Sequence, residues 1–155
     1  MTLRPVRFDD LDLICRHRRD MFRDGRGMDP AIDEAAGPYR AWLEPRLRDG
    51  RYFGYVLEVD GKVAASCGLE IVDWPPSPRH PHEARRGYVS NVFVEPEFRR
   101  RGYGRLLMEA AAAEFERRGV SYAYLHATDA GVPLYQQLGW QITNEMAKFF
   151  TPKAR

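Results

Sequence analysis

The chain is organised around residues 88–107, which read YVSNVFVEPEFRRRGYGRLL. Residues 88–94 are rich in β-branched and aromatic side chains, and Glu95-Pro96 ends the run, so this part predicts a strand. Apolar residues at helical spacing then predict a helix over residues 102–118. Three arginines followed by Gly102 and Gly104 lie where the strand gives way to the helix. The stretch therefore predicts a strand, a tight loop and a helix.

The loop between this strand and this helix has the composition of an anion site. The first N–H groups of a helix have no intrahelical acceptor and lie at the positive end of its dipole, so they stabilise a phosphate. Gly102 and Gly104 let the backbone bend sharply and approach the ligand closely. A dinucleotide fingerprint does not fit, because Leu107 stands at the place of its third glycine, and the Gly-Lys-Ser/Thr of a P-loop is absent.

Two segments carry a resemblance to a known family. Residues 99–104 resemble the acetyl-CoA motif of the GNAT superfamily of N-acetyltransferases, Gln/Arg-x-x-Gly-x-Gly/Ala, and residues 134–140, LYQQLGW, resemble the family's Leu-Tyr-x-x-x-Gly-Phe segment. The two matches occur in the family's order within residues 88–140. The resemblance implies acetyl-CoA as co-substrate and direct transfer of its acetyl group to a primary amine acceptor, either a small molecule or a peptide.

The resemblance also implies roles for particular residues. The diphosphate would bind the glycine loop, and the pantetheine arm would pair with the preceding strand as an added strand does. Tyr135 would be the general acid that protonates the departing CoA thiolate. The residues expected to bind the co-substrate are Val92, Phe93, Val94, Arg99, Arg100, Arg101, Gly102, Tyr103, Gly104 and Arg105.

The general base has several candidates, because a protonated amine must lose a proton before it attacks. His126 follows Leu125, where some protein-acetylating relatives have a glutamate, and a histidine's pKa suits the task. Glu70 lies near the end of a predicted strand and can face the acceptor. A water chain is a third possibility, and His126 as a core histidine or Glu70 as a solvent-facing residue are the structural alternatives.

Composition supports a single domain over residues 1–155. Net charge is only +2, with 24 basic and 22 acidic residues, which does not imply nucleic acid as a partner. No run of about 18 apolar residues is present to span a membrane. Two cysteines without metal-ligand spacing and the absence of a signal segment indicate the cytoplasm, with no metal site. The basic group at Arg16, Arg18 and Arg19 is expected on a solvated helix face.

The remaining elements give a mixed α/β fold. Asp60-Gly61 predicts a hairpin between strands at residues 51–59 and 62–72. Residues 23–38 are expected to form a loop or broken helix, because they hold Pro30 and three glycines. The other expected elements are strands at 3–8, 122–128 and 141–150 and helices at 9–22, 39–48 and 132–138. Together they predict a GNAT-like, mostly antiparallel twisted sheet of about six strands, with one parallel strand–helix–strand unit and helices on both faces.

Two other classes of function compete with catalysis. A non-catalytic acyl-CoA-binding sensor would keep the glycine loop and lose the acid, so Tyr135 argues against it. An arginine-rich nucleic-acid binder would need its basic residues on one face. The sequence leaves open the identity of the amine acceptor and the oligomeric state, although homodimers are common among similar proteins.

Overall fold

A computed structural model describes residues 1–150 of the chain. These residues form five strands and four α-helices, with two short 3₁₀ turns, η1 (Phe8–Asp10) and η2 (Pro96–Phe98). The strands are β1 (Thr2–Pro5), β2 (Tyr52–Val59), β3 (Lys62–Asp73), β4 (Arg85–Val94) and β5 (Ala123–Leu125). The helices are α1 (Leu11–Arg26), α2 (Pro30–Asp49), α3 (Tyr103–Arg117) and α4 (Val132–Gln137).

The strands form one sheet in the order in which they occur in the chain. Pairs β1–β2, β2–β3 and β3–β4 are antiparallel, whereas β4 and β5 are parallel and joined through α3. The predicted hairpin is confirmed, since Asp60 and Gly61 both have positive φ, 52° and 75°, as a two-residue turn of this kind requires. The predicted mixed fold with one parallel unit is confirmed as well.

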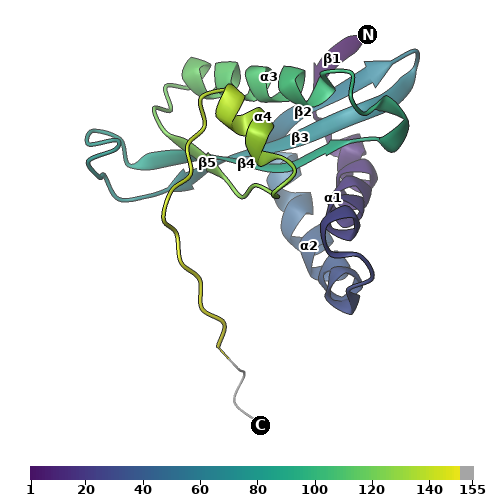
Figure 1. The fold of residues 1–155 in the computed structure, drawn as a ribbon, viewed down its shortest axis with the longest axis horizontal. Helices are drawn as coiled ribbons and strands as arrows, with labels where there is room; N and C mark the ends of the chain where they lie inside the picture. Colours follow the sequence, from purple (N-terminus) through teal and green to yellow (C-terminus); the bar gives the residue numbers. More distant parts are fainter. Residues whose placement is uncertain (151–155) are drawn as a thin grey trace.

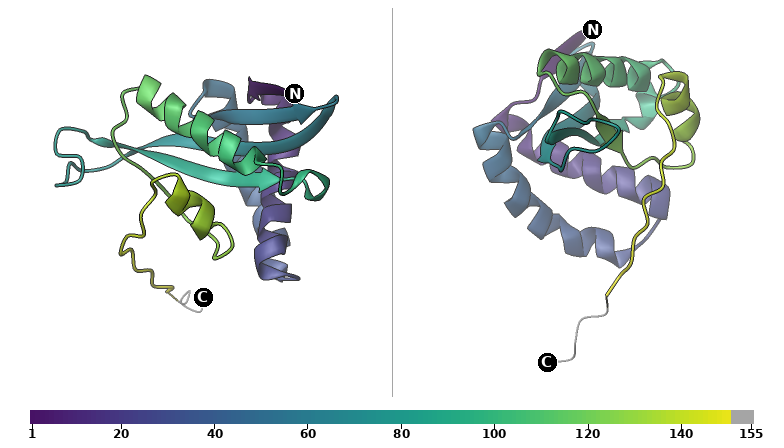
Figure 2. Two further views of the ribbon diagram at one scale, coloured as in Figure 1. Left: turned by 45° about the horizontal axis from the view of Figure 1, so that its top comes forward. Right: turned by 90° about the vertical axis from the view of Figure 1, so that its left-hand side faces the viewer.

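Helices cover both faces of the sheet (Figures 1 and 2). Helix α3 lies on one face, where Leu107, Met108 and Phe115 pack on β2, β3 and β4. Helices α1 and α2 lie on the other face and bury Ile14, Leu43 and other apolar residues against β2. The two faces therefore have separate apolar cores, with the sheet between them.

The loop or broken helix predicted over residues 23–38 is wrong in its extent, because only residues 27–29 separate α1 from α2. Helix α2 begins at Pro30 and continues through Pro38 and Pro45 to Asp49. Asp29 caps its start by accepting a hydrogen bond from the Ala31 N–H, and proline suits the first helical position. Burial of one face against α1 and β2 overrides the local cost of the two internal prolines.

The predicted final strand is also wrong. Residues 141–150 are extended but pair with no strand in the described structure, so the sheet has five strands rather than about six. Figure 1 shows this segment leaving α4 and running away from the fold. The segment has the sequence pattern of a strand, but no strand within residues 1–150 pairs with it.

Candidate functional site

A bulge in β4 shapes the candidate site. Pairing between β3 and β4 shifts register between Ser66 and Gly68, and opposite this shift Asn91 has a φ of 54°. Asn91 therefore faces α1 and α2, the same side as Ser90, instead of the opposite side. Sequence reasoning missed the bulge, although asparagine is one of the few residues that tolerate positive φ.

Strand β5 pairs with only the first half of β4. Their register runs from Gly87–Ala123 to Val89–Leu125 and then ends. Beyond Val89, no described strand pairs with the β5 side of β4. The backbone of residues 90–94, which includes the predicted Val92, Phe93 and Val94, therefore has one edge available to an extended ligand.

The predicted glycine loop lies where β4 passes into α3. Arg100 and Gly102 have positive φ, 61° and 81°, which turns the chain sharply into the helix. The first hydrogen bond of the helix runs from the Leu106 N–H to the Gly102 carbonyl at 3.1 Å. The N–H groups just before Leu106, including those of Tyr103, Gly104 and Arg105, are therefore available to an anion at the positive end of α3.

The four arginines of this loop have different surroundings. Arg99 donates to the Val94 carbonyl at 2.9 Å and pairs with Asp24 at 2.6 Å, so it ties the loop to α1. Arg105 donates to the side chain of Gln137 at 2.7 Å, which joins α3 to α4. Arg101 lies over the ring of Phe98, and Arg100 makes no ion pair with any of residues 1–150. Arg100 and Arg101 are the cations best placed to meet a phosphate.

Tyr135 lies on α4, on the α3 side of the sheet, and packs with Met108 and Phe115. Its ring meets that of Trp140 edge-on, with centroids 6.5 Å apart. Burial, and to a smaller degree the neighbouring Cys67, raises the pKa of its phenol. The preceding Gly131 is needed here, because a Cβ at that position would lie 2.9 Å from a carbon of the Tyr135 ring. The site thus holds a tyrosine that stays protonated at neutral pH.

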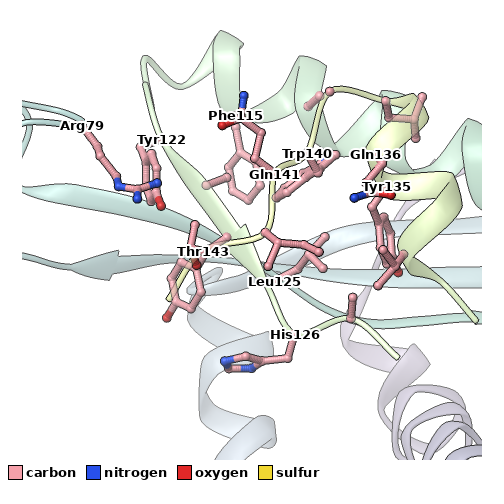
Figure 3. A pocket seen from close by; sticks show the side chains of 18 of the residues that line it. Arg79, Phe115, Tyr122, Leu125, His126, Tyr135, Gln136, Trp140, Gln141 and Thr143 are labelled. Atoms are coloured by element: carbon pink, nitrogen blue, oxygen red, sulfur yellow. The ribbon is translucent and has the colours of Figure 1, made fainter. Parts of the chain in front are cut away.

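Tyr135 lines a hollow of about 780 Å³ between β5, the end of α3, α4 and the first residues of the C-terminal segment. Figure 3 shows Phe115 and Trp140 at one end of this hollow and His126 at the other. Leu125 lies between them, on the strand whose pairing with β4 has just ended. The hollow therefore reaches from the α3 core to the point at which the two strands separate.

Glu70 lies on the opposite face of the sheet, in a cavity of about 200 Å³. Strand pairing places it directly across from Tyr88 on β4. Burial raises the pKa of Glu70 above the usual value of a glutamate, and Arg46 and Arg18 partly offset that rise. The lining residues of this cavity are Arg18, Tyr39, Trp42, Glu70, Tyr88 and Ser90. The alternative that Glu70 simply faces solvent is wrong.

Arg18 is not on a solvated face, contrary to expectation. Its guanidinium donates to the Asn91 side chain at 2.9 Å and lies over the Tyr39 ring, 4.2 Å from the centroid. Asn91 in turn donates to the hydroxyls of Tyr39 and Tyr52, at 2.7 and 3.0 Å. Side chains from α1, α2, β2 and β4 thus meet at the bulge and form one wall of the cavity. No local pattern in the sequence reveals these contacts.

His126 does not line the Glu70 cavity. Its Nδ1 lies 3.2 Å from the Tyr88 hydroxyl and its Nε2 lies 3.5 Å from a Glu145 carboxylate oxygen, while 64% of the side chain is exposed. It is therefore not a core histidine. Figure 3 shows its imidazole turned away from Tyr135. Within residues 1–150, Tyr88 is the one residue of the Glu70 cavity whose side chain lies within hydrogen-bonding distance of His126.

Comparison with known proteins identifies the family. A model of the acetyltransferase (GNAT) family matches residues 11–140. The chain belongs to the GNAT family. A crystal structure of a GCN5-related N-acetyltransferase from Ralstonia eutropha JMP134 is 47% identical, with a TM-score of 0.94 over 96% of this chain and 97% of that one. This result confirms the family and the fold predicted from residues 88–140.

Two other relatives are more distant. The ribosomal protein bS18-alanine N-acetyltransferase of Escherichia coli K12 is 30% identical over 93 residues, which cover 58% of this chain and 55% of that protein. A predicted acetyltransferase from Clostridium acetobutylicum, solved with acetyl-CoA, is 23% identical with a TM-score of 0.85 over 96% of this chain and 95% of that one. The match to the curated bS18-alanine acetyltransferase thus spans only about half of that protein's length.

None of the helices within residues 1–150 combines the length and apolar character needed to cross a bilayer.

Proposed function

We propose that this GNAT protein is an acetyl-CoA-dependent N-acetyltransferase that moves the acetyl group directly to a primary amine. The observation that carries the proposal is the separation of β4 and β5 beyond Val89, with Tyr135 on one side of the sheet and Glu70 on the other. An acyl donor entering the gap from the glycine loop would have an acid and a base on opposite sides. That arrangement suits attack by an amine and departure of a thiolate.

The residues present fit acetyl-CoA as the acyl donor. The free N–H groups at the start of α3 and the cations Arg100 and Arg101 would hold the diphosphate. The open edge of β4 over residues 90–94 would pair with the amides of the pantetheine arm. A strand N–H near the thioester carbonyl would stabilise the negative charge that develops there on attack. Acetyl-CoA supplies the acetyl group and leaves as the CoA thiol.

Proton transfer is assigned to two residues. Glu70 accepts a proton from the acceptor's ammonium or from the amine as the C–N bond forms, directly or through a water. Tyr135 donates its phenolic proton to the sulfur as the C–S bond breaks, and then regains a proton from solvent. The raised pKa of Glu70 makes it a stronger base than an exposed glutamate, and the raised pKa of Tyr135 keeps its proton available. His126 stays a candidate only as a relay through Tyr88.

The acceptor is proposed to enter on the α1 and α2 side. The cavity there combines the Glu70 carboxylate with the aromatic rings of Tyr39, Trp42 and Tyr88, so it suits an ammonium group on a small molecule or a peptide end. The E. coli relative is by name an N-acetyltransferase of alanine in ribosomal protein bS18, and a fold neighbour is an aminoglycoside N-acetyltransferase. Both acceptor types therefore belong in a first panel.

The test is release of CoA thiol from acetyl-CoA across amines and peptides, with the native protein compared with Tyr135→Phe. Release that depends on the amine and falls strongly in the variant would support the proposal. Acetyl-CoA binding without release for any acceptor would favour the non-catalytic sensor instead. Binding that depends strongly on salt and is indifferent to CoA would favour a nucleic-acid binder.

A further inference from the structure

The cavity on the α1 and α2 side holds two side chains of opposite charge. Arg18 comes from α1 and Glu70 from β3, and both line the cavity of about 200 Å³. The charge of Arg18 reaches Glu70 across this space, because it partly offsets the rise that burial causes in the pKa of Glu70. A small molecule in the cavity can therefore contact a cation and an anion at once.

Arg18 differs from the arginines beside it in α1. Arg16 and Arg19 both form ion pairs with Asp20, at 3.6 and 3.3 Å. Within residues 1–150, Arg18 forms no ion pair with Glu70 or with any other carboxylate. A partly buried cation without an anionic partner is costly to keep. The cavity thus has a place for an anionic group beside Arg18.

The guanidinium of Arg18 is held in a fixed position. It lies over the rings of Phe22 and Tyr39, 4.8 and 4.2 Å from their centroids. It donates one hydrogen bond within residues 1–150, to the Asn91 side chain, which leaves its other N–H donors available. A planar guanidinium with free donors binds a carboxylate through two parallel hydrogen bonds. Arg18 is therefore suited to a carboxylate on the acceptor.

Glu70 provides the complementary half of the cavity. Among the side chains of residues 1–150, its carboxylate has no hydrogen-bond partner. The rings of Tyr39, Trp42 and Tyr88 line the same space, and aromatic faces attract an ammonium group. In a free α-amino acid, the ammonium and the carboxylate are attached to one carbon, so one small molecule can meet Glu70 and Arg18 together.

An aromatic surface, formed by Tyr88, Tyr124 and Trp74, leads away from the cavity. Tyr88 pairs directly with Glu70 on one side and with Tyr124 on the other, so these side chains share one face of the sheet. The rings of Tyr88 and Tyr124 are stacked with centroids 4.8 Å apart, and Trp74 lies 6.5 Å from Tyr124. Trp74 is 39% exposed. This surface suits an aromatic side chain of the acceptor.

We propose that the acceptor is a free α-amino acid with an aromatic side chain. Its carboxylate pairs with Arg18, its amine faces Glu70 and its ring packs on the aromatic surface. This inference rests on the proposed acetyl transfer and decides between the two acceptor types that the transfer leaves open. In a peptide, the residue that carries the terminal amine has no free carboxylate beside that amine.

The reaction that follows is balanced. The amine nitrogen forms a bond to the acetyl carbon as the C–S bond of acetyl-CoA breaks. The proton that leaves the nitrogen goes to Glu70, and the departing thiolate takes a proton from Tyr135. The products are the N-acetyl amino acid and the CoA thiol.

The first test compares phenylalanine, phenylalaninamide and phenethylamine as acceptors in CoA-thiol release by the native protein. All three have the same ring and a primary amine, but only phenylalanine has the carboxylate. We expect kcat/KM for phenylalanine to exceed that for each analogue by about 10-fold or more, as one charged hydrogen-bonded contact provides. An equal or larger kcat/KM for either analogue would overturn the inference and leave acetyl transfer itself in place.

Two further outcomes separate this inference from the proposed function. Release with other amines but with none of these three acceptors would overturn only the inference. No release with any amine or peptide of the wider panel would reject the proposed function, and the inference with it. Alanine has the same two charges without the ring, so its kcat/KM should be about 10-fold lower than that of phenylalanine. Equal values would exclude the aromatic surface from the acceptor site.

The second test asks whether Arg18 causes the preference for phenylalanine over phenethylamine. Arg18→Gln keeps a donor for Asn91 but removes the charge, so we expect the ratio of the two kcat/KM values to fall by about 10-fold or more. Arg46→Gln is the matched control. Arg46 also acts on Glu70 and lies over the Trp42 ring, but it does not line the cavity, so the ratio should stay at its native value.

The fold of the Arg18 variant is checked by urea denaturation. A folded Arg18→Gln protein with the native ratio would overturn the inference. If Arg18→Gln does not fold, Arg18→Lys takes its place, because lysine keeps the charge and loses the planar pair of donors. We expect a lowered ratio for it as well, and a native ratio would contradict the assigned pairing.

Discussion

The two sides of the sheet are built from different parts of the chain. On the α3 side, the proposed co-substrate site is made largely of backbone N–H groups within residues 99–106, held in place by the positive φ of Arg100 and Gly102. On the α1 and α2 side, the proposed acceptor cavity is made of side chains that come from α1, α2, β3 and β4. The first site depends on local geometry, whereas the second depends on contacts between distant residues.

The largest effect is expected from Gly104→Glu, which puts a negative charge beside the free N–H groups of α3. A Cβ at this position would meet only a carbon of Leu134, at 3.5 Å, so the fold has room for it. We expect acetyl-CoA affinity to fall by about 10³-fold or more, because the carboxylate occupies the place of the diphosphate and repels it. Calorimetric titration of acetyl-CoA measures the change.

Gly37→Glu is the matched control for that substitution. Gly37 lies in α2, where a Cβ would have no neighbouring atom within 4 Å, and its φ is not positive. The same added charge there should leave acetyl-CoA affinity nearly unchanged. Unchanged affinity in Gly104→Glu as well would remove the phosphate site from this loop.

Tyr135→Phe tests the acid on the same side of the sheet. A general acid contributes about 10²–10⁴-fold to a rate, so we expect kcat to fall by about 10²-fold or more while acetyl-CoA affinity changes little. Loss of the hydroxyl leaves the ring packed against the α3 core and Trp140. Tyr55→Phe, on β2, whose hydroxyl donates to Glu114 near the end of α3, is the control and should keep kcat. A Tyr135→Phe enzyme with native kcat would mean that water protonates the thiolate.

Glu70→Gln tests the proposed general base, which lies in the cavity on the α1 and α2 side of the sheet. Burial raises the pKa of Glu70, so the fraction of active, ionised enzyme should increase with pH through a midpoint above the usual glutamate value of about 4.3. We expect kcat/KM to fall by about 10–10²-fold in the variant. The rise of kcat/KM with pH that comes from ionisation of Glu70 should also be absent from its pH profile. Any dependence of kcat/KM on pH that remains in the variant would come from deprotonation of the acceptor amine.

His126→Gln is the comparison that decides between the two candidate bases. Of the described residues that line the proposed acceptor cavity, Tyr88 is the one within hydrogen-bonding distance of His126, with its hydroxyl 3.2 Å from the imidazole. We expect its loss to change kcat/KM by no more than a few-fold. A larger loss in His126→Gln than in Glu70→Gln would exchange their roles.

The same contrast explains what the sequence can predict. The glycine loop and the hairpin at Asp60-Gly61 are each specified by a few consecutive residues whose backbone needs are known. The role of Arg18 cannot be read from its neighbours in α1, because its partners Tyr39 and Asn91 come from α2 and β4. Residues 141–150 have the pattern of a strand, but a pattern does not say which strand is the partner.

Asn91 links the bulge to the proposed acceptor cavity, and its test measures stability. Asn91→Ala removes hydrogen bonds to the hydroxyls of Tyr39 and the buried Tyr52 and leaves a non-glycine residue at positive φ. We expect the free energy of unfolding to fall by about 2–4 kcal/mol. Urea denaturation measures it, and the amine's KM should rise while acetyl-CoA affinity changes little.

Asn91→Gly separates the two causes of that loss. Glycine also removes the hydrogen bonds but adopts the φ of 54° without strain. It should therefore be more stable than Asn91→Ala by about 1 kcal/mol. Equal stability of the two variants would show that the bulge relaxes once its side chain is gone. The proposed acceptor cavity would then depend on the Asn91 hydrogen bonds alone. It would differ even more from the proposed co-substrate site, which is built from backbone N–H groups.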